Sequence, residues 1–134
     1  MLVEDNSMDV FVVKKILGEF DPSLFVRVAR DGQEALRYLR ETAADSSAAC
    51  PTLVLLDLNI PKIAGLEVLR ELRSASRCNL TPVIIVTSSG AEADRAAAQA
   101  LRADGYFKKP ASVTAYAELR ELIKKVLEAG KQTN

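Results

Sequence analysis

The sequence predicts an α/β protein, a doubly wound parallel sheet of five strands with five helices on its two faces. Five short apolar runs alternate with longer segments in which apolar residues recur at helical spacing. The run Leu53–Leu56 is apolar at every position, which is typical of a strand buried on both faces of a parallel sheet. The 134 residues are enough for one domain, which we expect at 1–130 with a tail at 131–134.

Each expected strand is short and ends at a polar residue or a turn. The first apolar run meets Glu4, the second follows the turn Asp21-Pro22, and the central run stops at Asp57. The fourth ends in a Thr-Ser-Ser-Gly stretch and the fifth in Lys-Lys-Pro. The expected strands are Met1–Val3, Ser23–Ala29, Thr52–Asp57, Val83–Val86 and Gly105–Phe107.

Five helices are expected after these strands, because apolar residues recur there at three- and four-residue spacing. Asn6 or Ser7 can cap the first, Asp31 the second and Ser112 the last. The fourth is rich in alanine, the residue with the highest helix propensity. The expected spans are about 7–19, 32–41, 65–73, 92–103 and 113–129, with Gly130 ending the last helix.

Composition excludes several classes of function. Eighteen basic and eighteen acidic residues cancel, which gives no basic surface for nucleic acid. The first ten residues carry acids where a signal peptide needs positive charge, and no long apolar run follows, so we expect a soluble cytoplasmic protein without membrane contact. The sequence has no histidine, which excludes Ser/His and Cys/His catalysis and histidine-bound zinc.

The two cysteines form no Cys-x-x-Cys pair. Cys50 and Cys78 are far apart in the sequence, and a cytoplasmic protein usually keeps its thiols reduced. We therefore expect two reduced cysteines in loops.

Reactive side chains follow the expected strands at one edge of the sheet. Crossovers in parallel sheets are right-handed, so the carboxyl ends of all strands share an edge, where ligands collect. Glu4 and Asp5 end the first strand, Asp57 the third, Thr87 the fourth and Lys109 the fifth. Three carboxylates in a dry crevice raise one another's pKa, and a lysine and a divalent cation relieve this. Ligation by oxygen atoms alone suits Mg²⁺.

Four segments together resemble the receiver domain of two-component response regulators. They are Glu-Asp-Asn after the first strand, and the stretches LLDLNIPKIAG, VTSS and GYFKKP. The resemblance runs from about Leu2 to Ala129 and implies the flavodoxin-like strand order 2-1-3-4-5. It also implies that Asp57 accepts a phosphoryl group. Asp5, Asp57 and the backbone carbonyl of Asn59 would ligate Mg²⁺, and Glu4 would act through water.

The resemblance assigns further roles at the same edge. Thr87 would bond a phosphoryl oxygen, and Lys109 would pair first with Asp57 and then with the phosphoryl group. Tyr106 occupies the position of an aromatic switch residue that turns inward when Thr87 moves. The Lys109–Pro110 peptide bond is typically cis in such domains.

The expected partners are proteins. Because the chain has no histidine, its phosphoryl donor must be another molecule, a sensor histidine kinase or a phosphotransfer protein. The loop Thr42–Pro51 and the stretch VLLDLNIPK resemble stand-alone receivers that serve bacterial phytochrome kinases. Such a protein is expected to be a phosphoacceptor and not an enzyme, with slow autodephosphorylation allowed. No output domain is expected after the last helix, so the signal would leave through protein contacts.

Two surfaces are left with two interpretations each. Met8 and Phe11 lie off the apolar stripe of the first helix, where they form either a kinase-docking patch or a partial contact with a neighbouring loop. The broad apolar face of the last helix serves either core packing or a homodimer through the last strand and helices.

Two other functions remain as alternatives. A receiver-like binding module could work without phosphate, although such modules usually lack part of the acid, hydroxyl and lysine set that is complete here. A haloacid-dehalogenase-like, Mg²⁺-dependent phosphatase also forms an aspartyl phosphate. It needs a second acid two residues after the nucleophile, where this chain has Asn59.

Overall fold

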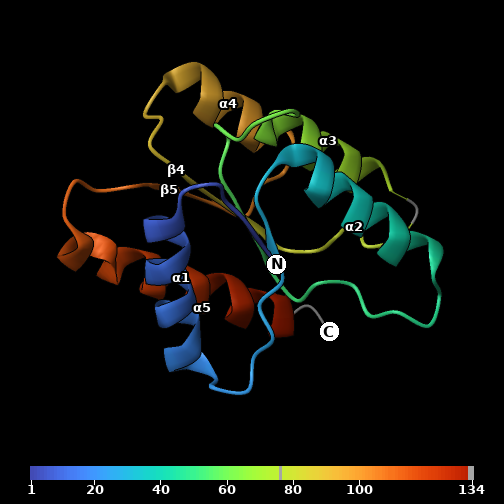
Figure 1. Ribbon diagram of the computed structural model, residues 1–134, viewed down its shortest axis with the longest axis horizontal. Helices are drawn as coiled ribbons and strands as arrows, with labels where there is room; N and C mark the ends of the chain where they lie inside the picture. The colour runs from blue at the N-terminus through green and yellow to red at the C-terminus, as the bar shows by residue number, and fades with distance from the viewer. Residues whose placement is uncertain (76, 133–134) are drawn as a thin grey trace.

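A five-stranded parallel sheet forms the centre of the protein, with the strand order β2-β1-β3-β4-β5 (Figure 1). The predicted fold class and strand order are therefore confirmed. The computed structural model describes residues 1–75 and 77–132. The strands are β1 (Leu2–Val3), β2 (Val28–Ala29), β3 (Val54–Leu56), β4 (Val83–Thr87) and β5 (Gly105–Lys108).

The helices cover the two faces of the sheet, as Figure 1 shows. They are α1 (Ser7–Phe20), α2 (Gly32–Ala44), α3 (Gly65–Ser74), α4 (Glu92–Ala100) and α5 (Ala117–Gln132), with a 3₁₀ helix η1 (Val113–Tyr116) before α5. On one face, α1 and α5 bury Val13, Leu119 and Ile123 against the strand residues Leu55 and Ile84.

The other face is covered by α2, α3 and α4. Leu36, Leu69 and Ala98 of these helices pack against Val54 and Ile85. Alternate residues of β3 and β4 thus serve opposite cores, which is why both strands read as unbroken apolar runs. Within the described chain, no helix combines the length and apolarity needed to span a membrane.

The second strand is much shorter than predicted. Only Val28 and Ala29 of the expected Ser23–Ala29 pair with β1, opposite Leu2 and Val3. Phe25 is 84% exposed. The reason is that β1 itself offers two residues, so the alternating residues before Val28 have no neighbouring strand to pair with.

Helix starts follow the predicted caps, whereas helix ends differ. The Asn6 side chain accepts a hydrogen bond from the Asp9 backbone N–H at 3.0 Å, and Asp31 caps α2 in the same way. The helix α4 ends at Ala100, three residues early, and Arg102 then adopts a positive φ of 63°. Gly130 does not end α5, which continues to Gln132.

The last helical segment begins differently from the prediction. Ser112 caps η1 instead of starting α5 directly, and its hydroxyl accepts from the Thr114 backbone N–H. The side chain of Val113 and the last two residues of the expected tail lie outside the described residues. Four of the predicted apolar residues of this segment are buried, namely Tyr116, Leu119, Ile123 and Val126.

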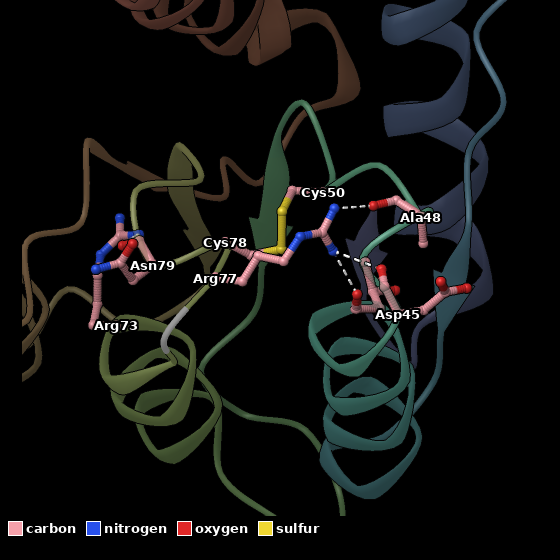
Figure 2. Close-up of a disulfide and its surroundings, with 8 residues drawn as sticks. Asp45, Ala48, Cys50, Arg73, Arg77, Cys78 and Asn79 are labelled. Carbon is pink, nitrogen blue, oxygen red and sulfur yellow. Dashed lines mark hydrogen bonds between the residues drawn. A yellow bond between two sulfur atoms is a disulfide. The ribbon is translucent and has the colours of Figure 1, made fainter.

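The prediction of two reduced cysteines is wrong. Cys50 and Cys78 form a disulfide across a sequence separation of 28 residues, with their Cα atoms 5.4 Å apart (Figure 2). Cys50 precedes β3 and Cys78 precedes β4, and these strands are paired neighbours. Distance along the chain therefore does not keep the two thiols apart.

An arginine beside the disulfide joins the same two loops. The Arg77 guanidinium donates to the backbone carbonyl oxygens of Thr42 at 2.7 Å and Asp45 at 3.0 Å, and also to that of Ala48 (Figure 2). The α3–β4 loop is thus held to the last turn of α2 and to the α2–β3 loop by one covalent link and these three hydrogen bonds, at the edge where the strands begin.

Candidate functional site

The carboxyl ends of four strands bring the predicted polar residues together. Glu4 follows β1, Asp57 follows β3, Thr87 ends β4 and Lys109 follows β5. Glu4, Asp57 and Thr87 are only 2%, 4% and 0% exposed. Their burial is maintained by the apolar strands that precede them, and a buried carboxylate requires a partner.

Lys109 is that partner. Its ammonium nitrogen lies 2.7 Å from Glu4 Oε2, 2.8 Å from Asp57 Oδ2 and 2.8 Å from Asp9 Oδ2. An ammonium group has three N–H donors, so each can meet one carboxylate. Burial alone would lower the pKa of Lys109, but its bonds to Asp57, Asp9 and Glu4 raise that pKa above its ordinary value.

The two buried acids respond differently to the same lysine. Burial alone would raise the pKa of Asp57, but hydrogen bonds from Lys109 and from the Asn59 backbone N–H hold it below its usual value. Burial dominates at Glu4 and raises its pKa to about 7, although Lys109 and the Asn6 backbone N–H oppose this. Asp57 is therefore the ionised acid of the pair at neutral pH, with Glu4 close to its titration point.

Three acids form a cluster suited to a metal ion. One carboxylate oxygen each from Glu4, Asp5 and Asp57 lies within 4.8 Å of the others, and Asp5 is exposed. Carboxylate oxygens with access to water are the ligands that Mg²⁺ prefers. The donor set therefore fits the predicted cation.

The turn after β3 fixes the orientation of Asp57. The Asn59 backbone N–H donates to Asp57 Oδ1 at 3.0 Å, and the Gly65 backbone N–H donates to the Leu58 carbonyl oxygen at 3.1 Å. A Cβ at Gly65 would overlap the carbonyl oxygen of Asp57. The turn can thus approach the strand end this closely only with glycine at that position.

Thr87 and Tyr106 are connected through Ser89 in the β4–α4 loop. The Ser89 backbone N–H donates to Thr87 Oγ1 at 3.4 Å, and the Tyr106 hydroxyl donates to the Ser89 carbonyl oxygen at 2.8 Å. The Arg95 guanidinium carbon lies 4.4 Å from the centre of the Tyr106 ring. The Ser89 hydroxyl also donates to Asp94 of α4.

The predicted cis bond before Pro110 is wrong, because the described residues contain no cis peptide bond. The Lys109 backbone N–H donates to the Thr87 carbonyl oxygen at 2.8 Å, which continues the β4–β5 pairing to the last residue before proline. Before proline, the trans form is the cheaper one by about 0.5–1 kcal/mol.

Sequence reasoning missed Asp9 and Ser89. Asp9 looks like an ordinary acid of a first helical turn, a position where acids are favoured by the helix dipole. Its sequence signal is only that α1 starts at the same edge of the sheet as the strand ends. Ser89 contacts Thr87 and Tyr106 through its backbone, so its residue type does not predict these two contacts.

The proposed docking residues are exposed. Met8 and Phe11 are 64% and 65% exposed on α1, whereas the neighbouring Val12 is buried. Phe11 and Val12 line a groove of about 250 Å³ between α1 and the start of α5, which Tyr116 and Arg120 line from the other side. Lys15 and Glu19 also line this groove, so the exposed apolar side chains of Met8 and Phe11 stand beside a mixed apolar and charged surface.

The chain matches the family model of the response regulator receiver domain over residues 1–130. It is 30% identical over 128 residues to the probable methanogenesis regulatory protein FilR2 of Methanothrix harundinacea, covering 96% of this chain and 80% of that protein. It is 33% identical over 109 residues to the response regulator Rcp1 of Synechocystis sp., covering 81% and 74%.

Solved structures show the same likeness. The phosphorylated cyanobacterial phytochrome response regulator RcpA matches with a TM-score of 0.81 at 34% identity, over 92% of this chain and 89% of that one. The Mn²⁺-bound form of Rcp1 matches with a TM-score of 0.69 at 30% identity, over 95% of this chain and 87% of that one. The bacteriophytochrome response regulator AtBRR matches with a TM-score of 0.73 at 34% identity, over 93% of this chain and 89% of that one. With its strand order, its buried Asp57–Lys109 pair and these matches, the chain belongs to the family of response regulator receiver domains of two-component signalling.

Proposed function

We propose that this protein accepts a phosphoryl group on Asp57 from a sensor histidine kinase or a phosphotransfer protein, and relays the signal by protein–protein contacts. The observation that carries this proposal is the buried ion pair of Asp57 with Lys109, 2.8 Å apart, beside the acidic cluster with Glu4 and Asp5. Receiver domains are typically signalling modules and not enzymes, and slow autodephosphorylation would be the only turnover here.

The proposed transfer uses the carboxylate of Asp57 as a nucleophile. A new O–P bond forms at Asp57 while the N–P bond of the donor's phosphohistidine breaks, and the bonding pair returns to the imidazole nitrogen. A lowered pKa keeps Asp57 ionised for this attack. Lys109 is placed to neutralise charge on the phosphoryl oxygens, which is the main protein contribution in phosphoryl transfer.

Asp5, Asp57 and the backbone carbonyl of Asn59 would hold Mg²⁺, with Glu4 acting through a water molecule. The fit of the cluster and the Mn²⁺-bound form of the relative Rcp1 support this assignment. When bound, the ion supplies positive charge at the phosphoryl oxygens. Together with Lys109, a bound cation would offset the negative charge of the carboxylates around Asp57.

Thr87 and Tyr106 would report the phosphorylated state. A phosphoryl group on Asp57 attracts the Thr87 hydroxyl, which already accepts from the Ser89 N–H. Because the Tyr106 hydroxyl bonds the Ser89 carbonyl, movement of this loop would change the Tyr106 contacts. A local change in charge would thereby alter the surface around β5 and α4.

Phytochrome-type kinases are the donors that the relatives favour, since RcpA and AtBRR are phytochrome and bacteriophytochrome response regulators. The donor would act in the cytoplasm and dock on the exposed surface of Met8 and Phe11. A homodimer through the last strand and helices would be one route for output.

The test is phosphorylation of the purified protein with [³²P]acetyl phosphate and Mg²⁺, and with a phosphorylated phytochrome-type kinase. We expect base-labile label on the wild type, none on Asp57→Asn, and normal label on the matched control Asp21→Asn, an exposed aspartate. Equal labelling of Asp57→Asn would place the acceptor elsewhere.

Docking is tested with Met8→Asp combined with Phe11→Asp. Transfer from the kinase should slow while labelling by acetyl phosphate stays normal, because the small donor needs no docking surface. Unchanged transfer from the kinase would remove these residues from the interface.

A further inference from the structure

We propose that Asp9 is a positioning residue for the phosphotransfer reaction, holding the Lys109 ammonium in place while the other two carboxylates around it change their partners. This inference rests on the proposed function, because it concerns the same reaction at Asp57.

Asp9 differs from the other partners of Lys109 in where it comes from. Glu4 and Asp57 follow strands, whereas Asp9 belongs to the first turn of α1. Its Oδ2 lies 2.8 Å from Lys109 Nζ, as close as that of Asp57. Among the described residues, the acids grouped closely enough to share a metal ion are Glu4, Asp5 and Asp57, and Asp9 is not one of them.

Asp9 is itself held from two sides. Its backbone N–H donates to Asn6 Oδ1 at 3.0 Å, which fixes the start of α1. The Tyr116 hydroxyl donates to Asp9 Oδ1 at 3.4 Å, and the buried Tyr116 ring packs on Phe107 of β5 with 5.5 Å between ring centres. One carboxylate oxygen of Asp9 thus faces Tyr116 while the other faces Lys109.

The reaction disturbs the other two contacts of Lys109. The carboxylate oxygens of Asp57 lose their negative charge when the acyl phosphate forms, and the charge then lies on the phosphoryl oxygens, so Lys109 must exchange its contact with Asp57 Oδ2 for one with the phosphoryl group. Glu4 is in the group that would serve the metal ion. Asp9 is in neither role, so the reaction leaves its ion pair with Lys109 in place. An ammonium fixed by a charged acceptor is already oriented before the phosphoryl group arrives, which lowers the barrier to transfer.

This arrangement predicts a specific kinetic signature. Removing the charge of Asp9 should slow phosphorylation even when the metal site is saturated, because Lys109 loses an anchor and the metal ligands lose nothing. Tyr116 should act in the same direction but more weakly, because it acts only through Asp9.

The experiment compares Asp9→Asn, Tyr116→Phe and the double variant with the wild type. The matched control is Glu67→Gln, an exposed acid in the first turn of α3. Initial rates of labelling by acetyl phosphate are measured at saturating Mg²⁺, and Mg²⁺ affinity is measured by calorimetry. Asp9→Asn keeps the cap of α1, because Asn6 bonds the backbone N–H of residue 9.

For Asp9→Asn we expect the saturated rate to fall about tenfold, the equivalent of one hydrogen bond between charged groups, with Mg²⁺ affinity changed less than about twofold. Tyr116→Phe should lower the rate about threefold, and the double variant should be no slower than Asp9→Asn, because residues that act through one another are not additive. Glu67→Gln should match the wild type.

Three results would overturn the inference: a saturated rate for Asp9→Asn within twofold of the wild type, a loss confined to Mg²⁺ affinity, or a Tyr116→Phe effect that adds in full to that of Asp9→Asn. Absence of label on the wild type would instead contradict the proposed function, so the two failures are distinguishable. If Asp9→Asn does not fold, as judged by thermal unfolding, Tyr116→Phe alone decides, and an unchanged rate for it would contradict the role of Asp9.

Discussion

At the scale of single residues, the site is governed by one ammonium group among several carboxylates. Lys109 binds Glu4 and Asp57, which are also two of the three acids that could share a metal ion. The lysine and a cation therefore compete for the same two carboxylates. Because of this competition, a substitution of Lys109 should affect cation binding and phosphorylation in opposite directions.

Replacing Lys109 by glutamine should strengthen Mg²⁺ binding while slowing phosphorylation. The change removes the competing positive charge from Glu4 and Asp57, so we expect Mg²⁺ affinity to rise about three- to tenfold. It also removes the charge that stabilises the transferring group, so labelling by acetyl phosphate should fall by about tenfold or more. Calorimetric titration measures the Mg²⁺ affinity, and initial labelling rates measure phosphorylation, with Lys62→Gln as the control. Weaker Mg²⁺ binding by Lys109→Gln would contradict the competition.

Glu4 should make Mg²⁺ binding dependent on pH. Its pKa is raised to about 7, so the carboxyl is mostly protonated below that pH and mostly ionised above it. Because a cation must displace the proton, affinity should be about three- to tenfold lower at pH 6 than at pH 8. Calorimetry at both pH values measures the difference, which Glu4→Gln should abolish. If Glu4→Gln kept the full pH dependence, the dependence would belong to another titrating group.

At the scale of secondary structure elements, the start of α3 positions the acceptor. Gly65 is the first residue of α3, and a Cβ there would overlap the carbonyl oxygen of Asp57. The turn and the strand end must therefore approach each other without a side chain between them. The geometry of Asp57 depends on this contact as well as on its own hydrogen bonds.

Gly65→Ala should destabilise the protein by about 1–3 kcal/mol, the usual cost of forcing extra atoms into a packed region. Gly18→Ala is the matched control, because a Cβ at Gly18 meets nothing within 4 Å. Gly18 lies in the last turn of α1, where alanine should stabilise by up to about 1 kcal/mol. Urea unfolding measures both, and equal stability of the two variants would show that the contact at Asp57 relaxes without cost.

The same scale shows what the sequence can and cannot predict. Strands buried on both faces, such as β3 and β4, have an unmistakable apolar pattern, and the caps Asn6 and Asp31 marked the starts of their helices. The length of β2 was not predictable from its own alternation, because it depends on the two residues that β1 offers. The early end of α4 depends on the backbone at Arg102, which residue type does not reveal.

In the site, too, local patterns predict the residues and contacts between elements are missed. Residues that end strands were predicted to meet, and Glu4, Asp57 and Lys109 do meet. Asp9 reaches the site from a helix, and no strand pattern places it there. The contact depends on how α1 packs on the sheet, which only the three-dimensional structure shows.

At the scale of the whole molecule, the two edges of the sheet are stabilised differently. The carboxyl edge holds the charged residues around Lys109. The opposite edge holds the Cys50–Cys78 disulfide and the hydrogen bonds of Arg77, which join the loops before β3 and β4. The disulfide joins residues 28 apart in the sequence, from before β3 to before β4.

Replacing both cysteines by serine should lower the free energy of unfolding by about 3 kcal/mol, because the disulfide restricts the unfolded chain. The wild type unfolded in reductant should lose a similar amount, and the double variant should not respond to reductant. Urea unfolding with and without reductant measures the loss. Phosphorylation by acetyl phosphate below the unfolding transition should stay within about twofold of the wild type, since the disulfide lies at the other edge. Identical stability with and without reductant would show that the link does not form in solution.

The separation of these two edges bears on how such a protein can evolve. Substitutions around the disulfide and Arg77 can adjust the durability of the fold to a warmer or more oxidising habitat without altering the acceptor chemistry. Met8 and Phe11, which we propose as docking residues, are exposed on α1, so their substitution leaves the disulfide and its contacts unchanged. Robustness and signalling are therefore open to selection as independent traits within a chain of only 134 residues.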